Sequence, residues 1–148
     1  MIAVIQRVSS AQVEVDSEVV GKIRNGFLIL LGVFKDDDEL DAKLLVDKIS
    51  VLRVFQDENK NMNLSIQDVN GSILVVSQFT LCGDWRKGRR PSFSSSAPPE
   101  IAETLYLKFC ELLSIQNIDL KTGQFAAMMD VELINDGPVT FVMDSKDK

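Results

Sequence analysis

The chain has no histidine among its 148 residues. Histidine is the side chain that most often moves protons at neutral pH, and it is the general base of Ser-His-Asp and Cys-His hydrolases. It is also the commonest protein ligand for metals. The absence excludes these arrangements. If the chain is a hydrolase, its proton chemistry must come from carboxylates, hydroxyls, water or the substrate itself.

The sequence is also poor in cysteine and lacks long apolar runs. Cys82 and Cys110 lie far apart and form no C-x-x-C pair, so we expect two free thiols. No stretch approaches the roughly 18–20 apolar residues that cross a bilayer, and the first residues do not resemble a signal peptide. We therefore expect a cytoplasmic protein without membrane contact. No spacing of acidic residues predicts a metal site, and nothing predicts a cofactor.

Length and composition fit a single domain that covers residues 1–148. The net charge of −6 argues against the coating of a long nucleic-acid duplex. Cations nevertheless gather in one segment, where four of five positions are basic. These are Arg86, Lys87, Arg89 and Arg90. A local basic loop of this kind can hold one RNA end.

Two segments have helical periodicity. The first begins near Asp36, with Glu39 as its partner in a capping box. Its apolar stripe consists of Leu40, Leu44, Leu45, Ile49 and Leu52. The second begins at Pro98-Pro99-Glu100, since proline is tolerated in a first helical turn. Its stripe consists of Ile101, Leu105, Phe109 and Leu112, widened by Ala102, Tyr106 and Leu113.

Most of the remaining sequence predicts strands. Residues 12–16 alternate between polar and apolar, whereas 27–34 and 73–81 are continuous apolar runs typical of strands buried on both faces. Near the end, Asn135-Asp136-Gly137 predicts a turn between strands at 129–134 and 138–143. We predict a β-rich α/β fold: a mainly antiparallel or mixed sheet with two main helices packed on it, and no strand–helix–strand repeat.

Three segments could carry chemistry. The first contains Ser77, Gln78 and Thr80 at the end of the most apolar strand, where polar groups would become usable. Bonding of these groups to neighbouring backbone is the alternative. The second, residues 84–93, interleaves cations with aromatic residues, which suits a loop that grips phosphate while a ring covers a base or sugar; a solvated basic loop is equally open. The third, residues 135–140, is either a plain hairpin turn or a cis Gly-Pro element that directs two carbonyls outward.

Two of these segments together resemble a known family. Ser77-Gln78-Phe79-Thr80-Leu81 and Asn135-Asp136-Gly137-Pro138-Val139-Thr140 are similar to the paired motifs of the bacterial and eukaryotic D-aminoacyl-tRNA deacylases. The similarity runs nearly end to end and includes Gln6-Arg7-Val8, Met62-Asn63 and residues 87–93. One departure is Ala126, where we expect the family to prefer glycine. That difference concerns local backbone geometry near the pocket floor.

The resemblance implies an enzyme with the D-aminoacyl-tRNA deacylase-like fold. It would hydrolyse the ester of D-aminoacyl-tRNA, and of glycine mischarged on tRNA(Ala), to free amino acid and tRNA in translation quality control. The family implies a homodimer with inter-subunit active sites, and the 3′ acceptor end of aminoacyl-tRNA as partner. The implied catalytic residues are Ser77, Gln78, Phe79 and Thr80, the implied chiral filter is cis Gly137–Pro138, and the implied tRNA contacts are Arg86, Lys87, Arg89 and Arg90.

The implied mechanism uses backbone N–H groups near Phe79 and Thr80 to stabilise an oxyanion, with help from the 2′-hydroxyl of the terminal adenosine. The absence of histidine fits this scheme. Covalent catalysis by Thr80 is a second mechanism, although the sequence shows no base to activate it. Two other functions stay open: a non-catalytic nucleic-acid-binding interaction module, and a related deacylase that acts on an L-aminoacyl-tRNA.

Overall fold

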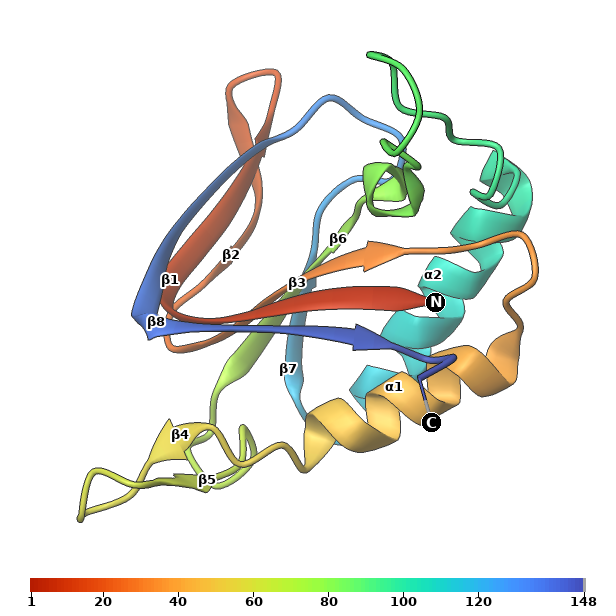
Figure 1. Ribbon diagram of the computed structural model, residues 1–148. Coiled ribbons are helices and arrows are strands. Elements are labelled where there is room, and N and C mark those ends of the chain that lie inside the picture. Colours follow the sequence, from red (N-terminus) through yellow and green to blue (C-terminus); the bar gives the residue numbers. More distant parts are fainter. Residues whose placement is uncertain (148) are drawn as a thin grey trace.

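A mixed sheet of six strands forms the body of the protein, and both α-helices pack against it (Figure 1). The computed structural model describes residues 1–147. The strands of this sheet are β1 (Ile2–Val15), β2 (Glu18–Ile23), β3 (Gly26–Gly32), β6 (Ser72–Ser77), β7 (Asp119–Thr122) and β8 (Asp130–Asp144). The other elements are α1 (Glu39–Ser50), α2 (Pro99–Ile115), the short 3-10 helix η1 (Phe79–Cys82), and a small ribbon of β4 (Phe55–Gln56) and β5 (Met62–Leu64).

Strand β1 organises the sheet. Its first half pairs antiparallel with β3, its second half with β2, and almost its whole length with β8. On the far side of β3, the strands β6 and β7 continue the sheet in parallel. The predicted β-rich α/β class with a mixed sheet and two packed helices is therefore confirmed.

The prediction that strand–helix–strand units are missing was wrong. Helix α1 lies between the parallel strands β3 and β6, and α2 lies between the parallel strands β6 and β7. Parallel neighbours need such a crossover, because a tight turn can join only antiparallel strands. The order of the elements was visible in the sequence, but the direction in which two strands pair depends on contacts between distant residues.

The sheet has an apolar cluster on each face. One cluster joins the helices to β1, β3 and β6, and its largest fully buried side chains include Phe27, Phe109, Ile5, Leu45 and Ile73. The smaller cluster lies where the curved sheet closes on itself, and it contains Val8, Ala11, Val13, Ile23, Leu28, Leu74 and Val76. The central strands are consequently buried on both faces, as their continuous apolar runs predicted.

Helix α1 differs from its prediction at its start and on its buried face. Its N-cap is Asp38, whose side chain accepts hydrogen bonds from the backbone N–H groups of Leu40 and Asp41, and the Asp41 carboxylate accepts one from the backbone N–H of Asp38. The capping box is therefore Asp38–Asp41 and not Asp36–Glu39. Leu40 is 73% exposed and Leu44 43% exposed, while the buried face consists of Ala42, Leu45, Val46 and Ile49.

Helix α2 begins as predicted, with proline in its first turn. Ile101 is exposed and stands outside the stripe, while the buried face includes Leu105, Tyr106, Phe109 and Leu113. Among the described residues, no helix has the length and apolar content needed to cross a membrane.

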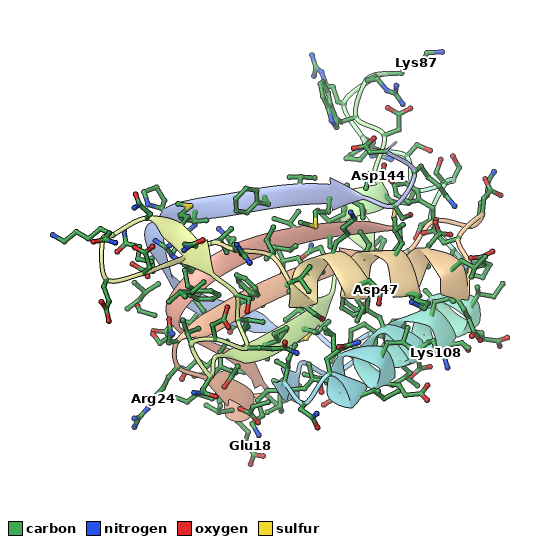
Figure 2. The ribbon with its side chains drawn as sticks, turned by 90° about the horizontal axis from the view of Figure 1, so that it is seen from below. Glu18, Arg24, Asp47, Lys87, Lys108 and Asp144 are labelled. Atoms are coloured by element: carbon green, nitrogen blue, oxygen red, sulfur yellow. The ribbon has the colours of Figure 1, made fainter. Side chains whose placement is uncertain are left out.

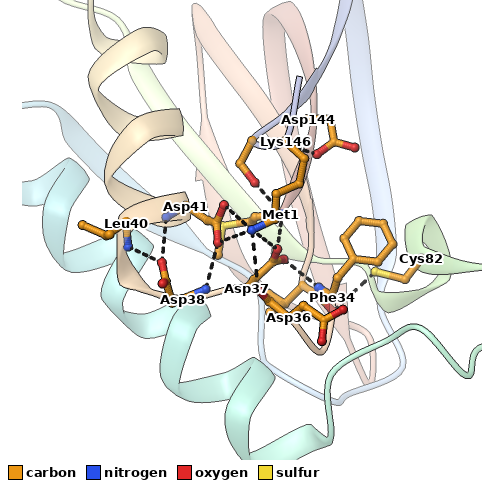
Figure 3. Close-up of polar contacts among 12 residues, drawn as sticks. Met1, Phe34, Asp36, Asp37, Asp38, Leu40, Asp41, Cys82, Asp144 and Lys146 are labelled. Carbon is orange, nitrogen blue, oxygen red and sulfur yellow. Dashed lines mark hydrogen bonds and ion pairs between the residues drawn. The ribbon is translucent and has the colours of Figure 1, made fainter. Parts of the chain in front are cut away.

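Ion pairs hold Met1 and Lys146 against the start of α1 (Figure 3). The Met1 ammonium lies 2.6 Å from Asp37 Oδ1, and both side-chain groups are inaccessible to solvent. Lys146 Nζ lies 2.8 Å from each carboxylate oxygen of Asp41. Burial raises the pKa of Asp41, but hydrogen bonds from Lys146 and from the Asp38 backbone outweigh burial and lower that pKa to about 2. The cluster therefore places a cation beside each carboxylate, the Met1 ammonium beside Asp37 and Lys146 beside Asp41.

Candidate active site

The first predicted site segment lies where β6 leaves the sheet. The strand ends at Ser77, Gln78 donates its backbone N–H to the Leu31 carbonyl at 2.8 Å, and the chain then turns into η1. The expected continuation of the strand to Leu81 was wrong, because these residues form a 3-10 turn. Phe79 is 55% exposed and Thr80 is also exposed, so the segment does emerge from the core.

Two backbone donors at this turn have no acceptor. Within residues 1–147, neither the N–H of Phe79 nor that of Thr80 donates a hydrogen bond, as expected for the first amides of a helical turn. They are adjacent in the chain, and both residues are exposed. Adjacent free donors at a solvent-accessible turn can stabilise a developing negative charge on oxygen.

The Thr80 hydroxyl has an amide as its neighbour. Gln78 Nε2 donates a hydrogen bond to Thr80 Oγ1. In the described part of the chain, no carboxylate or amine is hydrogen-bonded to this hydroxyl. A threonine nucleophile needs a base to accept its proton, and a donating amide cannot act as one. This geometry favours a positioning role for Gln78 and Thr80.

The buried thiols are equally unsuited to nucleophilic catalysis. Cys82 and Cys110 are free and buried, in agreement with the sequence analysis. Burial, followed by the negative charge of Asp37, raises the pKa of Cys82 to about 11, and burial raises the pKa of Cys110 to about 11. Their thiolates are therefore scarce at neutral pH. The described residues also contain no group of three or more cysteine, aspartate or glutamate side chains placed to hold a metal ion.

The predicted basic loop follows η1 directly. Its base is closed by two backbone hydrogen bonds of 2.8 Å between Asp84 and Ser92, and its tip extends away from the body of the protein, as the position of Lys87 shows in Figure 2. All four cations, Arg86, Lys87, Arg89 and Arg90, are exposed. Arg86 Nε lies 2.8 Å from Asp84 Oδ1. The loop is anchored beside η1, because the rings of Phe79 and Phe93 meet with centroids 5.0 Å apart.

The third segment is not a hairpin turn. Strand β8 runs without interruption from Asp130 to Asp144, and β1 pairs with it on both sides of the segment. The register passes from Asn135 opposite Val8 to Thr140 opposite Gln6, so residues 136–139 form a bulge opposite Arg7. The Gly137–Pro138 peptide bond in this bulge is cis. Gly137 and Pro138 are both exposed, so the bulge presents them outward.

Arg7 holds the bulge from behind, and the sequence analysis did not identify it as a site residue. Its side chain is 4% exposed. Its Nε donates to the Asp136 carbonyl at 3.1 Å and its Nη1 donates to the Val54 carbonyl. A signal was present in the sequence, because Arg7 continues the inward-facing alternation of Ala3 and Ile5. A charged residue at such a position needs buried partners.

Within one chain, the Ser77–Thr80 segment and the bulge of β8 lie far apart. Across the sheet, Ser77 of β6 pairs with Leu31 of β3, which pairs with Ala3 of β1. The bulge of β8 lies opposite Arg7, four residues further along β1. With the usual rise per residue and spacing between strands, the two motifs lie roughly 13 Å apart along the strands and roughly 14 Å apart across them. Figure 1 shows η1 and the bend of β8 at opposite ends of the sheet. Ser77–Thr80 therefore lies beside the basic loop, while Gly137 and Pro138 lie elsewhere on the same chain.

The loop between β7 and β8 contains the departure noted at Ala126. Ala126 has φ 61°, a left-handed conformation that glycine adopts more readily than alanine. Its neighbour Phe125 packs on Tyr106, with ring centroids 5.7 Å apart. The backbone here thus has the geometry that would favour the glycine expected at this position.

Comparison with known proteins agrees with these observations. The sequence matches the family described as D-Tyr-tRNA(Tyr) deacylase over residues 4–144. A D-aminoacyl-tRNA deacylase of Thermosipho africanus is 59% identical over 146 residues, which cover 99% of this chain and 98% of the relative. One of Clostridioides difficile is 55% identical over 145 residues, covering 98% and 97%.

Solved structures show the same fold. One described as "c-Myc DNA Unwinding Element Binding Protein" superposes with a TM-score of 0.92 at 40% identity, covering 99% of this chain and 100% of the other. A second, described as a probable eukaryotic D-amino acid tRNA deacylase, gives a TM-score of 0.83 at 17% identity, with 97% and 98% coverage. The full-length match, the free donor pair at the end of β6 and the bulge of β8 together lead to one conclusion: this chain belongs to the D-Tyr-tRNA(Tyr) deacylase family, a family of hydrolases.

Proposed function

We propose that this protein hydrolyses the ester bond of D-aminoacyl-tRNA in the cytoplasm, as its relatives' names indicate for them. The observation that carries the proposal is the free pair of N–H groups at Phe79 and Thr80, exposed beside a basic loop. A tetrahedral intermediate of ester hydrolysis carries a negative oxygen, and such a pair can receive it. The basic loop is placed to contact the acceptor end of the RNA.

The reaction needs no protein base in this scheme. Water adds to the ester carbonyl carbon, the carbonyl oxygen becomes an oxyanion that the two N–H groups receive, and the bond to the ribose oxygen then breaks. The proton of the attacking water passes to the departing ribose oxygen, which leaves as a hydroxyl, with the neighbouring 2′-hydroxyl of the terminal adenosine assisting. This route fits a chain without histidine and a Thr80 hydroxyl whose hydrogen-bond partner within residues 1–147 is the Gln78 amide. Ser77 and Gln78 line the wall beside these donors.

The second wall of the site comes from another copy of the chain. Gly137 and Pro138 are exposed and distant from η1 of their own subunit, so they are accessible to a neighbouring subunit. Exposed apolar side chains flank the bulge: Ile134 is 59%, Phe141 36% and Val142 63% exposed. A homodimer that covers this surface would place the bulge of one subunit at η1 of its partner.

In that dimer the bulge acts as the chiral filter. The carbonyls of Gly137 and Pro138, in a bulge that Arg7 anchors through the Asp136 carbonyl, would meet the side chain of an L-amino acid and exclude it, whereas a D-amino acid directs its side chain elsewhere. Glycine has no side chain to exclude. Glycine mischarged on tRNA(Ala) is therefore included among the proposed substrates.

A second candidate function is a non-catalytic nucleic-acid-binding module. The relative of known structure at 40% identity is described as a DNA unwinding element binding protein, and this chain has an exposed basic loop. A third candidate is deacylation of an L-aminoacyl-tRNA. The same assay separates all three.

The deciding experiment compares release of tyrosine from D-Tyr-tRNA and L-Tyr-tRNA by the purified protein in the presence of a chelator. Rapid release from the D-ester alone supports the proposal and the filter. Release from the L-ester alone supports the third candidate. Failure of a folded protein to hydrolyse either ester overturns the enzymatic proposal in favour of the binding module.

The donor pair has its own test. Phe79→Pro removes one N–H at the first position of η1, where proline is tolerated, and Gln78 (φ −140°, ψ 78°) lies outside the α-helical region that a following proline disfavours. Loss of one such donor is expected to lower kcat about 10²–10³-fold. Phe79→Ala keeps the N–H and serves as the matched control, and Thr80→Ala should keep substantial activity. An equal loss in Phe79→Ala and Phe79→Pro contradicts the role of the donor, and near-total loss in a folded Thr80→Ala protein supports the nucleophile.

A further inference from the structure

An exposed tryptophan stands among the cations of the loop at residues 84–92. Trp85 is 77% exposed and is followed directly by Arg86 and Lys87. Large aromatic side chains are usually at least half-buried in folded proteins. The exposed ring of Trp85 is therefore available to stack on a ligand.

Other exposed rings lie at the base of the same loop. Phe79 is 55% and Phe93 39% exposed, and the two rings meet edge to face with centroids 5.0 Å apart. Phe93 also packs on Gly83, where an added Cβ would lie 2.9 Å from its ring. Exposed aromatic rings thus lie at η1, where the proposed donors are, and at the base of the basic loop.

The loop is anchored at its base but free to contact a ligand at its tip. Two hydrogen bonds between Asp84 and Ser92 fix the base, and Asp84 also holds Arg86. Within residues 1–147, Lys87, Arg89 and Arg90 make no ion pair. Their charges are available to phosphates, since no carboxylate of the described chain neutralises them.

We propose that the loop at residues 84–92 binds single-stranded RNA, with Trp85 stacking on an unpaired base and Lys87, Arg89 and Arg90 contacting the flanking phosphates. The inference rests on the proposed function, and it identifies the part of the substrate beyond the ester: unpaired nucleotides adjacent to the terminal adenosine. A ring can stack on any base, but only where the base is not covered within a duplex. The loop therefore selects for an unpaired 3′ end rather than for a base sequence.

The only tryptophan of the chain makes a direct test possible. The intrinsic fluorescence of the wild-type protein is recorded while an uncharged RNA hairpin with an unpaired 3′ end in CCA is added. A hairpin of the same composition with a fully paired end is the control. We expect saturable quenching with the first RNA and at least tenfold weaker binding of the second. Unchanged fluorescence at RNA concentrations that saturate binding by anisotropy overturns the proposal.

Variants separate the stacking contact from the charges. Trp85→Ala should weaken binding of the unpaired RNA about 5- to 100-fold, the range expected for one stacked base, whereas Trp85→Phe should retain most of the affinity. Lys87→Ala should lower the slope of log K against log salt by about 0.7, the value for one phosphate contact on a single strand. Equal affinity of Trp85→Ala and wild type overturns the stacking role.

Turnover distinguishes failure of this inference from failure of the proposed function. Trp85→Ala should raise KM for D-Tyr-tRNA by a similar factor while kcat stays within about twofold, since the contact is remote from the ester. Unchanged KM with normal hydrolysis overturns the stacking site and leaves the hydrolase intact. Quenching by unpaired RNA without any hydrolysis supports the site and overturns the proposed reaction.

Discussion

At the scale of single residues, the structure gives physical reasons to several positions that the sequence marked. The polar run from Ser77 to Thr80 does emerge at the end of a buried strand, and Ala126 does occupy a conformation suited to glycine. Arg7 was quoted only as part of a family resemblance. Its role depends on carbonyls at Val54 and Asp136, which are 47 and 129 residues away in the chain. No local pattern could show them.

Replacement of Arg7 is expected to loosen the bulge of β8. Arg7→Ala removes a buried guanidinium from two carbonyls, and each carbonyl left without a donor costs about 1–3 kcal/mol. We expect the free energy of unfolding, measured with urea, to fall by about 2–5 kcal/mol. Where the protein stays folded, the ratio of D-Tyr-tRNA to L-Tyr-tRNA hydrolysis should also fall. Arg7→Lys keeps the charge but not the fork of donors, so its stability and selectivity should lie between those of wild type and Arg7→Ala. An Arg7→Ala protein as stable and selective as wild type would contradict this role.

Replacement of Ala126 is expected to stabilise the protein. Glycine adopts the left-handed conformation at φ 61° without the steric strain of alanine. This gain in stability is partly offset by the greater conformational freedom of glycine in the unfolded chain. Ala126→Gly should raise the free energy of unfolding by about 0.5–1 kcal/mol, measured by thermal or urea denaturation. The matched control is Ala127→Gly, which has no positive φ to relieve and should lower stability by a similar amount. Destabilisation by both changes would refute the argument.

At the scale of elements, periodicity located both helices but misassigned part of α1. Leu40 and Leu44 are apolar yet exposed, and the capping box starts at Asp38, two residues after the predicted one. Several aspartates in a row can each cap a helix, so the choice between them is made by surrounding contacts. Here those contacts are the buried pair of Asp37 with Met1 and the pair of Asp41 with Lys146.

The Asp41 cluster should give the protein an acid-sensitive component of stability. The pKa of Asp41 is lowered from 3.8 to about 2 in the folded protein, so the unfolded chain takes up the proton first as the pH falls. The stabilisation is fully present above about pH 4 and is lost as the pH falls towards 2. Because Lys146 is half exposed, we expect about 1 kcal/mol.

Denaturation at pH 5 and at pH 2.5 measures this component. Wild type should lose about 1 kcal/mol more than Asp41→Asn over this interval. Asp47→Asn is the control, because its ion pair with Lys43 lies at the surface and contributes little. An identical pH dependence of Asp41→Asn and wild type would exclude the effect.

At the scale of the whole molecule, the separation of the two motifs is the main finding. The sequence shows them as a pair, but register places the end of β6 and the bulge of β8 far apart on one curved sheet. In the proposed function a complete site requires a second copy, and the exposed residues Ile134, Phe141 and Val142 would provide an apolar surface for it.

Complementation between two inactive subunits tests this arrangement. Phe79→Pro removes an N–H donor. In Gly137→Phe, the added Cβ would lie 2.7 Å from a Val139 methyl, so the bulge would be distorted and its bulky side chain would obstruct the neighbouring pocket. A heterodimer purified with two different tags should recover about half of the wild-type activity, because one of its two sites combines only intact parts. If each site were built within one chain, the heterodimer would stay as inactive as either parent. A wild-type protein that is monomeric at assay concentration would also contradict the proposal.

The sequence by itself determined the class of elements, the identity of the buried strands and the residues of both motifs, because periodicity, turn residues and side-chain chemistry act over a few positions. The tertiary structure alone decided what depends on distant contacts. It made β6 and β7 parallel to β3, turned the expected hairpin at residues 135–137 into a bulge, buried Arg7 behind it and left the amides of Phe79 and Thr80 free. Strand pairing joins residues that are tens of positions apart, and only the folded chain specifies which of them meet.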